Sequence, residues 1–215
     1  MYIIFISMIY IPNIDNSNPI LIEDLRIEQY RLQKQVDKIL SKTDLKDTFS
    51  KYGKVSQVEG SYSYGLMVYP DIDIGIINNI VTKDNVSKLL KDIASKSYVR
   101  KVSFVDNVNH ISTRKGNPKG YWIGIEMPFE KDKWGIDCWI QQPNWIDESI
   151  GNSSITDRDY IERLKTLPQE SKDIILLIKY ELIIRKLYGS KFHSIDVYDA
   201  VMQGKVKNID QFLNL

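Results

Sequence analysis

Apolar residues recur at helical spacing near the start of the chain. Between Leu21 and Leu45 the apolar positions include Leu25, Ile27, Leu32, Val36 and Leu40, with charged residues between them. Apolar residues spaced by three or four positions form one stripe along a helix. The pattern predicts an amphipathic helix over these residues, followed by a short second helix at residues 45–51.

In the middle of the chain, short runs alternate between apolar and polar residues, which is typical of strands. These runs predict strands at residues 55–59, 71–76, 98–105, 121–127 and 134–140. Helical spacing returns once in this region and predicts a helix over residues 83–95. The charged connector FEKDK joins the last two strands, which indicates a hairpin.

The last sixty residues have a helical pattern with terminal signals. Thr156 is expected to be the N-cap of a helix over DRDYIERLKTL. Pro168 and Gly189 are expected to begin and end a long second helix. Ser194 and Gly204 are expected to bound a third helix.

This order of elements predicts an α+β fold in two parts. A mixed sheet flanked by helices is expected within residues 1–148, and a small C-terminal helical bundle within residues 155–215. The stretch GNSS, at 151–154, marks the linker between them. With 215 residues, the chain can form one large domain or two small ones and can bury a genuine core.

Composition narrows the classes of partner. The 29 basic and 28 acidic residues nearly balance, so no overall field favours nucleic acid or an anionic membrane. The single cysteine, Cys138, cannot form an intramolecular disulfide, which favours a reducing compartment and a cytoplasmic location. His110 and His193 are far apart and lack neighbours at zinc-ligand spacing.

The first residues, MYIIFISMIYIPN, are apolar but do not have the pattern of a leader. They lack a basic region and a small-residue cleavage site, and the run is too short to cross a bilayer. We expect a strand there, or an upstream extension with the native start near Met8.

Two carboxylates stand two residues apart in the apolar run DIDIGI. In a strand, Asp71 and Asp73 share one face while Ile72 and Ile74 point to the other. An unpaired, partly buried pair of like charges is costly, and a bound cation removes the cost. Magnesium suits such oxygen ligands and binds phosphate oxygens beside them. The alternative is an edge strand whose solvated face carries two acids.

A small-residue turn precedes these carboxylates. Gly60 and Ser61 follow a predicted strand and precede an expected short helix, so the turn offers backbone N–H groups and a hydroxyl to an anion. Glycine also permits the close approach of a phosphate. A phosphate-binding turn next to a pair of metal-binding aspartates predicts a site for a nucleoside triphosphate with its magnesium.

This arrangement resembles the motif of the DNA polymerase beta-like nucleotidyltransferase superfamily, in which a strand, a Gly-Ser turn and a short helix precede an Asp-x-Asp strand. The resemblance covers about residues 55–140, and the helical tail is similar to the C-terminal bundles of small-molecule and antibiotic nucleotidyltransferases. It implies a third carboxylate on a later strand, and WGIDCWI supplies Asp137. Glu126 is the competitor, either as third carboxylate or as general base for the acceptor hydroxyl.

The resemblance implies roles for these residues. Asp71, Asp73 and Asp137 would be the catalytic residues and would hold two magnesium ions, with Asp137 on the ion that activates the acceptor hydroxyl. Gly60 and Ser61 would hold the β- and γ-phosphates.

One cation of the tail is a further candidate for binding the nucleotide. Lys179, on the long predicted helix, would reach the triphosphate if the helical part closes over the site. The alternative is a solvated helix face, because Lys172, Lys179 and Lys186 recur every seven residues.

The implied activity is transfer of a nucleoside monophosphate from a triphosphate, expected to be ATP, to a hydroxyl of a small molecule such as an antibiotic, with release of pyrophosphate. One alternative is the same chemistry on a protein or on tRNA, as in toxin–antitoxin nucleotidyltransferases, although the near-neutral charge disfavours tRNA. Another is a non-catalytic nucleotide-binding module, which the presence of all three acids disfavours.

Overall fold

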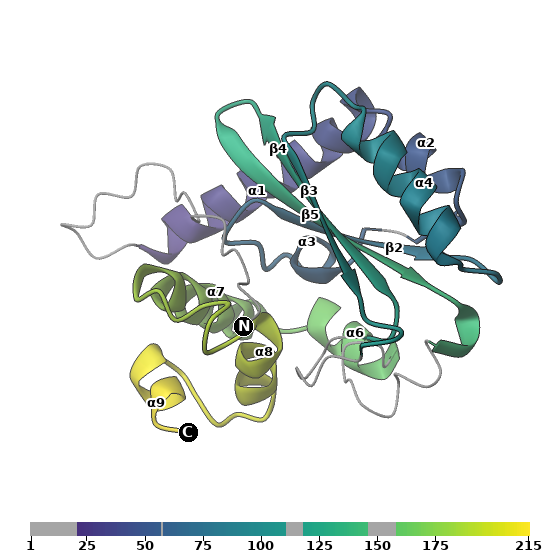
Figure 1. Cartoon of the computed structure of the whole chain (residues 1–215). Coiled ribbons are helices and arrows are strands. Elements are labelled where there is room, and N and C mark those ends of the chain that lie inside the picture. Colours follow the sequence, from purple (N-terminus) through teal and green to yellow (C-terminus); the bar gives the residue numbers. More distant parts are fainter. Residues whose placement is uncertain (1–20, 57, 111–117, 146–157) are drawn as a thin grey trace.

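The computed structural model describes residues 21–56, 58–110, 118–145 and 158–215 (Figure 1). The expectations for the N-terminal segment, for Thr156 as a helix cap and for the GNSS linker lie outside these residues. No helix within the described ranges combines the length and the apolar character that crossing a membrane requires.

A five-stranded mixed sheet forms the centre of the fold. Its spatial order is β1-β2-β5-β4-β3, where β2 and β5 are parallel and the other neighbours are antiparallel. The strands are β1 (Lys54–Val55), β2 (Asp71–Ile77), β3 (Lys101–Asp106), β4 (Tyr121–Phe129) and β5 (Asp132–Gln141). The strands β4 and β5 form the expected hairpin, and the whole confirms the predicted α+β fold with a mixed sheet.

Alternation along β2 and β5 gives the sheet one buried face and one half-buried face. The helices α1 (Ile22–Lys42), α2 (Leu45–Ser50) and α4 (Lys83–Ala94) cover the buried face, where their apolar residues form one core with those of the strands. Ile27 was expected in the apolar stripe of α1 but is 68% exposed, because the buried stripe runs through Leu25, Leu32, Val36 and Ile39 instead. The opposite face of the sheet carries Asp71, Asp73 and Asp137.

The C-terminal helices surround a second core. They are α6 (Arg158–Lys165), α7 (Gln169–Ile184), α8 (Ser194–Met202) and α9 (Ile209–Leu213). In Figure 1, α7, α8 and α9 gather at the lower left, and α6 lies below the sheet. This core also contains Tyr64, the last residue of the short helix α3 (Gly60–Tyr64), and Leu66 and Val68, which lie between α3 and β2. The division at residues 148–155 therefore stays a prediction.

Two helix boundaries of the tail differ from those expected, and one helix is additional. Gly189 does not end α7, because Arg185 caps the helix and Lys186, with φ of 57°, already has left-handed backbone. The N-cap of α8 is His193, so Ser194 is its first residue rather than its cap. The helix α9 was not predicted.

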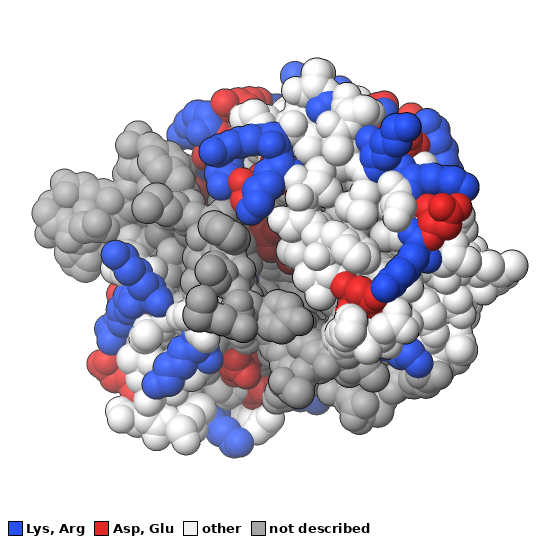
Figure 2. Space-filling model, viewed as in Figure 1, with Lys and Arg blue, Asp and Glu red and all other residues white. Residues whose placement is uncertain are grey.

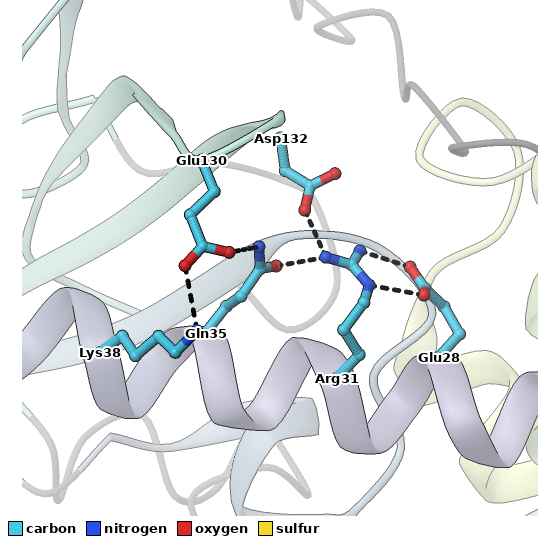
Figure 3. Close-up of polar contacts among 6 residues, drawn as sticks. All are labelled: Glu28, Arg31, Gln35, Lys38, Glu130 and Asp132. Atoms are coloured by element: carbon cyan, nitrogen blue, oxygen red, sulfur yellow. Dashed lines mark hydrogen bonds and ion pairs between the residues drawn. The ribbon is translucent and has the colours of Figure 1, made fainter.

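A polar network joins α1 to the turn of the β4–β5 hairpin (Figure 3). The Arg31 guanidinium donates to Asp132, at 2.5 Å, and to both carboxylate oxygens of Glu28. Gln35 and Lys38 both donate to Glu130 at 3.0 Å. Because Asp132 begins β5 and its side chain is only 1% exposed, the network fixes the start of a strand that also carries Asp137.

Candidate active site

Three carboxylates converge on the half-buried face of the sheet. Asp71 and Asp73 project from β2, and Asp137 projects from the neighbouring strand β5, directly beside Asp73 in the parallel register. One carboxylate oxygen of each lies within 4.8 Å of the others. All three are half-buried, and the intervening residues Ile72 and Ile136 point into the core. The structure thus brings together the two predicted aspartates and the predicted third one.

Negative charge is crowded at this point. Burial, followed by the charges of Asp137 and Asp73, raises the pKa of Asp71 well above its ordinary value. Burial, followed by the charge of Glu59, raises the pKa of Asp73 to about 6. Asp71 and Asp73 are thus harder to ionise than in water, and a cation between the carboxylates would relieve the repulsion.

Gly60 is required by the position of Asp73. A Cβ at Gly60 would lie 1.9 Å from Oδ2 of Asp73, and the φ of 65° is a left-handed conformation that suits glycine. The backbone N–H of Glu59 donates to the Asp73 carbonyl at 3.0 Å, which holds the turn against β2. Ser61, half-buried, is the next residue of α3. The Gly-Ser turn predicted to bind phosphate therefore lies in contact with a metal-ligand candidate.

Two tyrosines that the sequence analysis missed connect the carboxylates to the tail. The Tyr69 hydroxyl donates to Oδ2 of Asp71 at 3.3 Å and lies 3.4 Å from the Tyr188 hydroxyl. The Tyr188 hydroxyl in turn is hydrogen-bonded to the Ser194 hydroxyl at the start of α8. Nothing in the local sequence around Tyr69 indicates a partner more than one hundred positions away.

Lys179 lies in the core of the tail. Its side chain is fully buried, and Nζ donates to the Leu66 carbonyl at 2.7 Å and contacts the Tyr198 hydroxyl at 3.4 Å. Burial lowers the pKa of Lys179 to about 7, against the opposing effect of Asp73 and Asp71. The solvated-face alternative is therefore wrong for this lysine, because α7 is buried on most sides. Its contact with a triphosphate stays a prediction.

Glu126, the competitor for third carboxylate, lies apart from the group. It projects from the same face of the sheet but pairs with Lys133 at 2.9 Å and with Lys101 at 3.4 Å. Burial favours a higher pKa, but the two lysines outweigh it and lower the pKa of Glu126. A carboxylate held in this way is a weaker base. In the view of Figure 2, basic side chains lie above the middle of the molecule, and acidic atoms are recessed below them.

Comparisons with known proteins show the fold. No family model matches the chain, and no curated protein matches it. Among solved structures, the GLD-2–GLD-3 poly(A) polymerase complex is similar over 86% of this chain and 60% of that chain, with a TM-score of 0.50 and 12% identity. A cytoplasmic RNA terminal U-transferase gives a TM-score of 0.49 at 13% identity, covering 85% of this chain and 52% of that chain. The chain thus spans little more than half of these proteins. The predicted mixed sheet with flanking helices is thus confirmed as a fold that this chain shares with the poly(A) polymerase structure.

Proposed function

We propose that the chain transfers a nucleoside monophosphate from a nucleoside triphosphate to a hydroxyl group, with the aid of divalent metal ions. The observation that carries the proposal is the convergence of Asp71, Asp73 and Asp137 beside the Gly60 turn. The nucleotidyltransferase fold supports it, although fold alone does not specify a function.

The three acids fit a magnesium site. They offer hard oxygen ligands within 4.8 Å of one another, and mutual repulsion together with burial makes the carboxylates costly without a cation. The missing side chain at Gly60 leaves the space in which Oδ2 of Asp73 lies. Magnesium, when bound there, would supply positive charge to the oxygens that gain negative charge during transfer.

The reaction forms one bond and breaks one. The acceptor oxygen bonds to the α-phosphorus, the bond from that phosphorus to the oxygen bridging to the β-phosphate breaks, and pyrophosphate leaves. The hydroxyl proton passes to solvent. In this proposal Asp137 lies on the acceptor side, while Gly60 and Ser61 hold the β- and γ-phosphates through the N–H groups and the hydroxyl of the turn. Lys179, in its protonated form, favours ionisation of Asp71 and Asp73.

The proposal also covers the identities of the donor and the acceptor. ATP is the expected donor, and a hydroxyl of a small molecule is the expected acceptor. A nucleic-acid hydroxyl is the second candidate, because the solved structure with the TM-score of 0.50 is that of a poly(A) polymerase.

The decisive experiment measures pyrophosphate release from each of the four nucleoside triphosphates with magnesium and a set of hydroxyl-bearing acceptors. Asp71→Asn and Asp137→Asn should each lower the rate by about 100-fold or more, because each removes a charged ligand. Asp84→Asn, at an exposed position on α4, is the matched control and should keep the rate. A Mn²⁺ titration followed by paramagnetic relaxation checks metal binding separately. Full activity of both active-site variants would overturn the proposal.

A further inference from the structure

Two tryptophans lie on the face of the sheet that carries Asp137. Trp139 follows Asp137 by two residues on β5, and Trp122 is its register partner on β4, so both share the face of that carboxylate. Both are half-buried, and neither belongs to the core under the sheet or to the core of the tail. Large aromatic side chains with no place in a core are candidates for binding a ligand.

The ring of Trp122 lies beside the third carboxylate. Gly124 is the register partner of Asp137, and a Cβ at Gly124 would lie 2.4 Å from Cη2 and 2.7 Å from Cζ2 of Trp122. The indole therefore lies across the position where a side chain at residue 124 would stand. Glycine at this position lets the ring approach the sheet next to Asp137.

Apart from Asp71, Asp73 and Asp137, which the proposed metal ions would occupy, the side chains on this face offer little negative charge to a cationic acceptor. Over β3, β4 and β5, the acids of the half-buried face are Asp137 and Glu126, and Glu126 is paired with two lysines. A polyamine or aminosugar needs carboxylates at its amino groups, whereas a flat ring needs an aromatic surface. The surface next to Asp137 is aromatic, so it suits a flat ring.

We propose that Trp122 and Trp139 form the acceptor subsite and stack on the base of a nucleoside whose hydroxyl is the acceptor. This inference rests on the proposed function, which places the acceptor at Asp137. Stacking on an aromatic side chain strengthens the binding of a base by about 10- to 100-fold and tolerates any base. A base with an acceptor hydroxyl on its ribose is present both in a free nucleoside monophosphate and at the 3′ end of an RNA strand.

Binding can be measured without turnover. Trp134 is fully buried and Trp145 is 8% exposed, so quenching of tryptophan fluorescence by a stacked base would report on Trp122 and Trp139. Wild-type protein, without magnesium or triphosphate, is titrated with AMP, with a short oligoadenylate and with a non-aromatic aminocyclitol. We expect quenching by AMP or the oligoadenylate and none by the aminocyclitol. Similar affinities for AMP and the oligoadenylate identify a site for the nucleoside alone. A higher affinity for the oligoadenylate identifies the RNA end as the ligand.

The kinetic test separates an acceptor contact from a structural role. Trp122→Ala should raise the KM of the acceptor by about 10-fold or more and leave the KM of the triphosphate unchanged, while Trp122→Phe should keep most of the affinity. Phe104→Ala, which removes an exposed aromatic ring on the other face of β3, is the matched control. If Trp122→Ala unfolds at a lower temperature, Trp122→Leu takes its place.

The outcomes distinguish this inference from the proposed function. Turnover without quenching, or equal changes in both KM values, overturns the acceptor subsite and leaves the transferase intact. Quenching without turnover on any acceptor overturns the transferase, and with it the acceptor role of the two tryptophans. Quenching by the aminocyclitol overturns stacking.

Discussion

Gly60→Ala should disable the site while the fold persists. A Cβ at this position would lie 1.9 Å from Oδ2 of Asp73, and ordinary contact begins at 3.4 Å. The carboxyl oxygen must therefore retreat by about 1.5 Å, whereas metal sites tolerate about 0.2 Å. A displacement of about 1 Å at a reacting centre costs about 100-fold in rate. We expect kcat/KM to fall by at least this factor.

Backbone strain adds a separate and smaller effect. Alanine at a φ of 65° costs about 1–2 kcal/mol of folding stability. Gly204→Ala is the matched control for strain, because its φ is 67° and no atom lies within 4 Å of the added Cβ. Gly65→Ala is the matched control for place, because it caps the same short helix and meets only Nε2 of Gln29, at 3.8 Å.

Pyrophosphate release and urea unfolding, measured on the same preparations, separate the two effects. All three variants should lose similar stability, and Gly60→Ala alone should lose activity and affinity for Mn²⁺. If Gly60→Ala stays within about threefold of the Gly204→Ala rate, the contact with Asp73 does not govern the site and the reasoning from the glycine is refuted.

Two further predictions concern pH and the helix–hairpin network. Because protons compete with metal and the pKa of Asp73 is about 6, Mg²⁺ affinity, measured by calorimetry, should rise as pH rises through 6. The stability of the metal-free protein, measured by urea unfolding in EDTA, should fall over the same range because the folded state holds more protons than the unfolded state. A level Mg²⁺ affinity from about pH 5 to 7 would contradict the raised pKa of Asp73. Arg31→Met should lower the free energy of unfolding in urea by about 3 kcal/mol, because the Asp132 side chain is 1% exposed and loses its cation. The control Lys34→Met, in an exposed pair with Asp37, should lower it by less than about 1 kcal/mol. Equal losses would show that the burial of Asp132 is unimportant.

The sheet and its carboxylates could be predicted because strands have the simplest periodicity. Alternation in β2 places Asp71 and Asp73 on one face with Ile72 on the other, and the same rule orients Asp137 in β5. The resemblance implied a third carboxylate on a later strand, but the parallel pairing of that strand with β2 was not predicted. Once two strands are neighbours, register alone decides whether the acids meet.

The environment of the tail could not be predicted in the same way. Lys172, Lys179 and Lys186 recur like a solvated stripe, but α7 buries apolar residues around most of its circumference, so periodicity did not indicate which side of the helix faces solvent. The hydroxyl contacts of Tyr69 with Tyr188 depend on chain segments distant in sequence. Gly189 was expected to end α7, yet Lys186 already takes the left-handed conformation, where glycine is usual but not obligatory.

The segment that leads into β2 limits how this protein could be assembled from parts during evolution. Tyr64, Leu66 and Val68 are 5%, 0% and 6% exposed, and they pack among the tail helices although they directly precede Asp71 in the chain. Grafting a different tail onto this sheet would leave the three side chains in water, at about 1.5–3 kcal/mol for each large apolar one. Sheet and tail are therefore expected to be inherited as one piece, and a recombination junction between them should be tolerated only where this short segment travels with the helices.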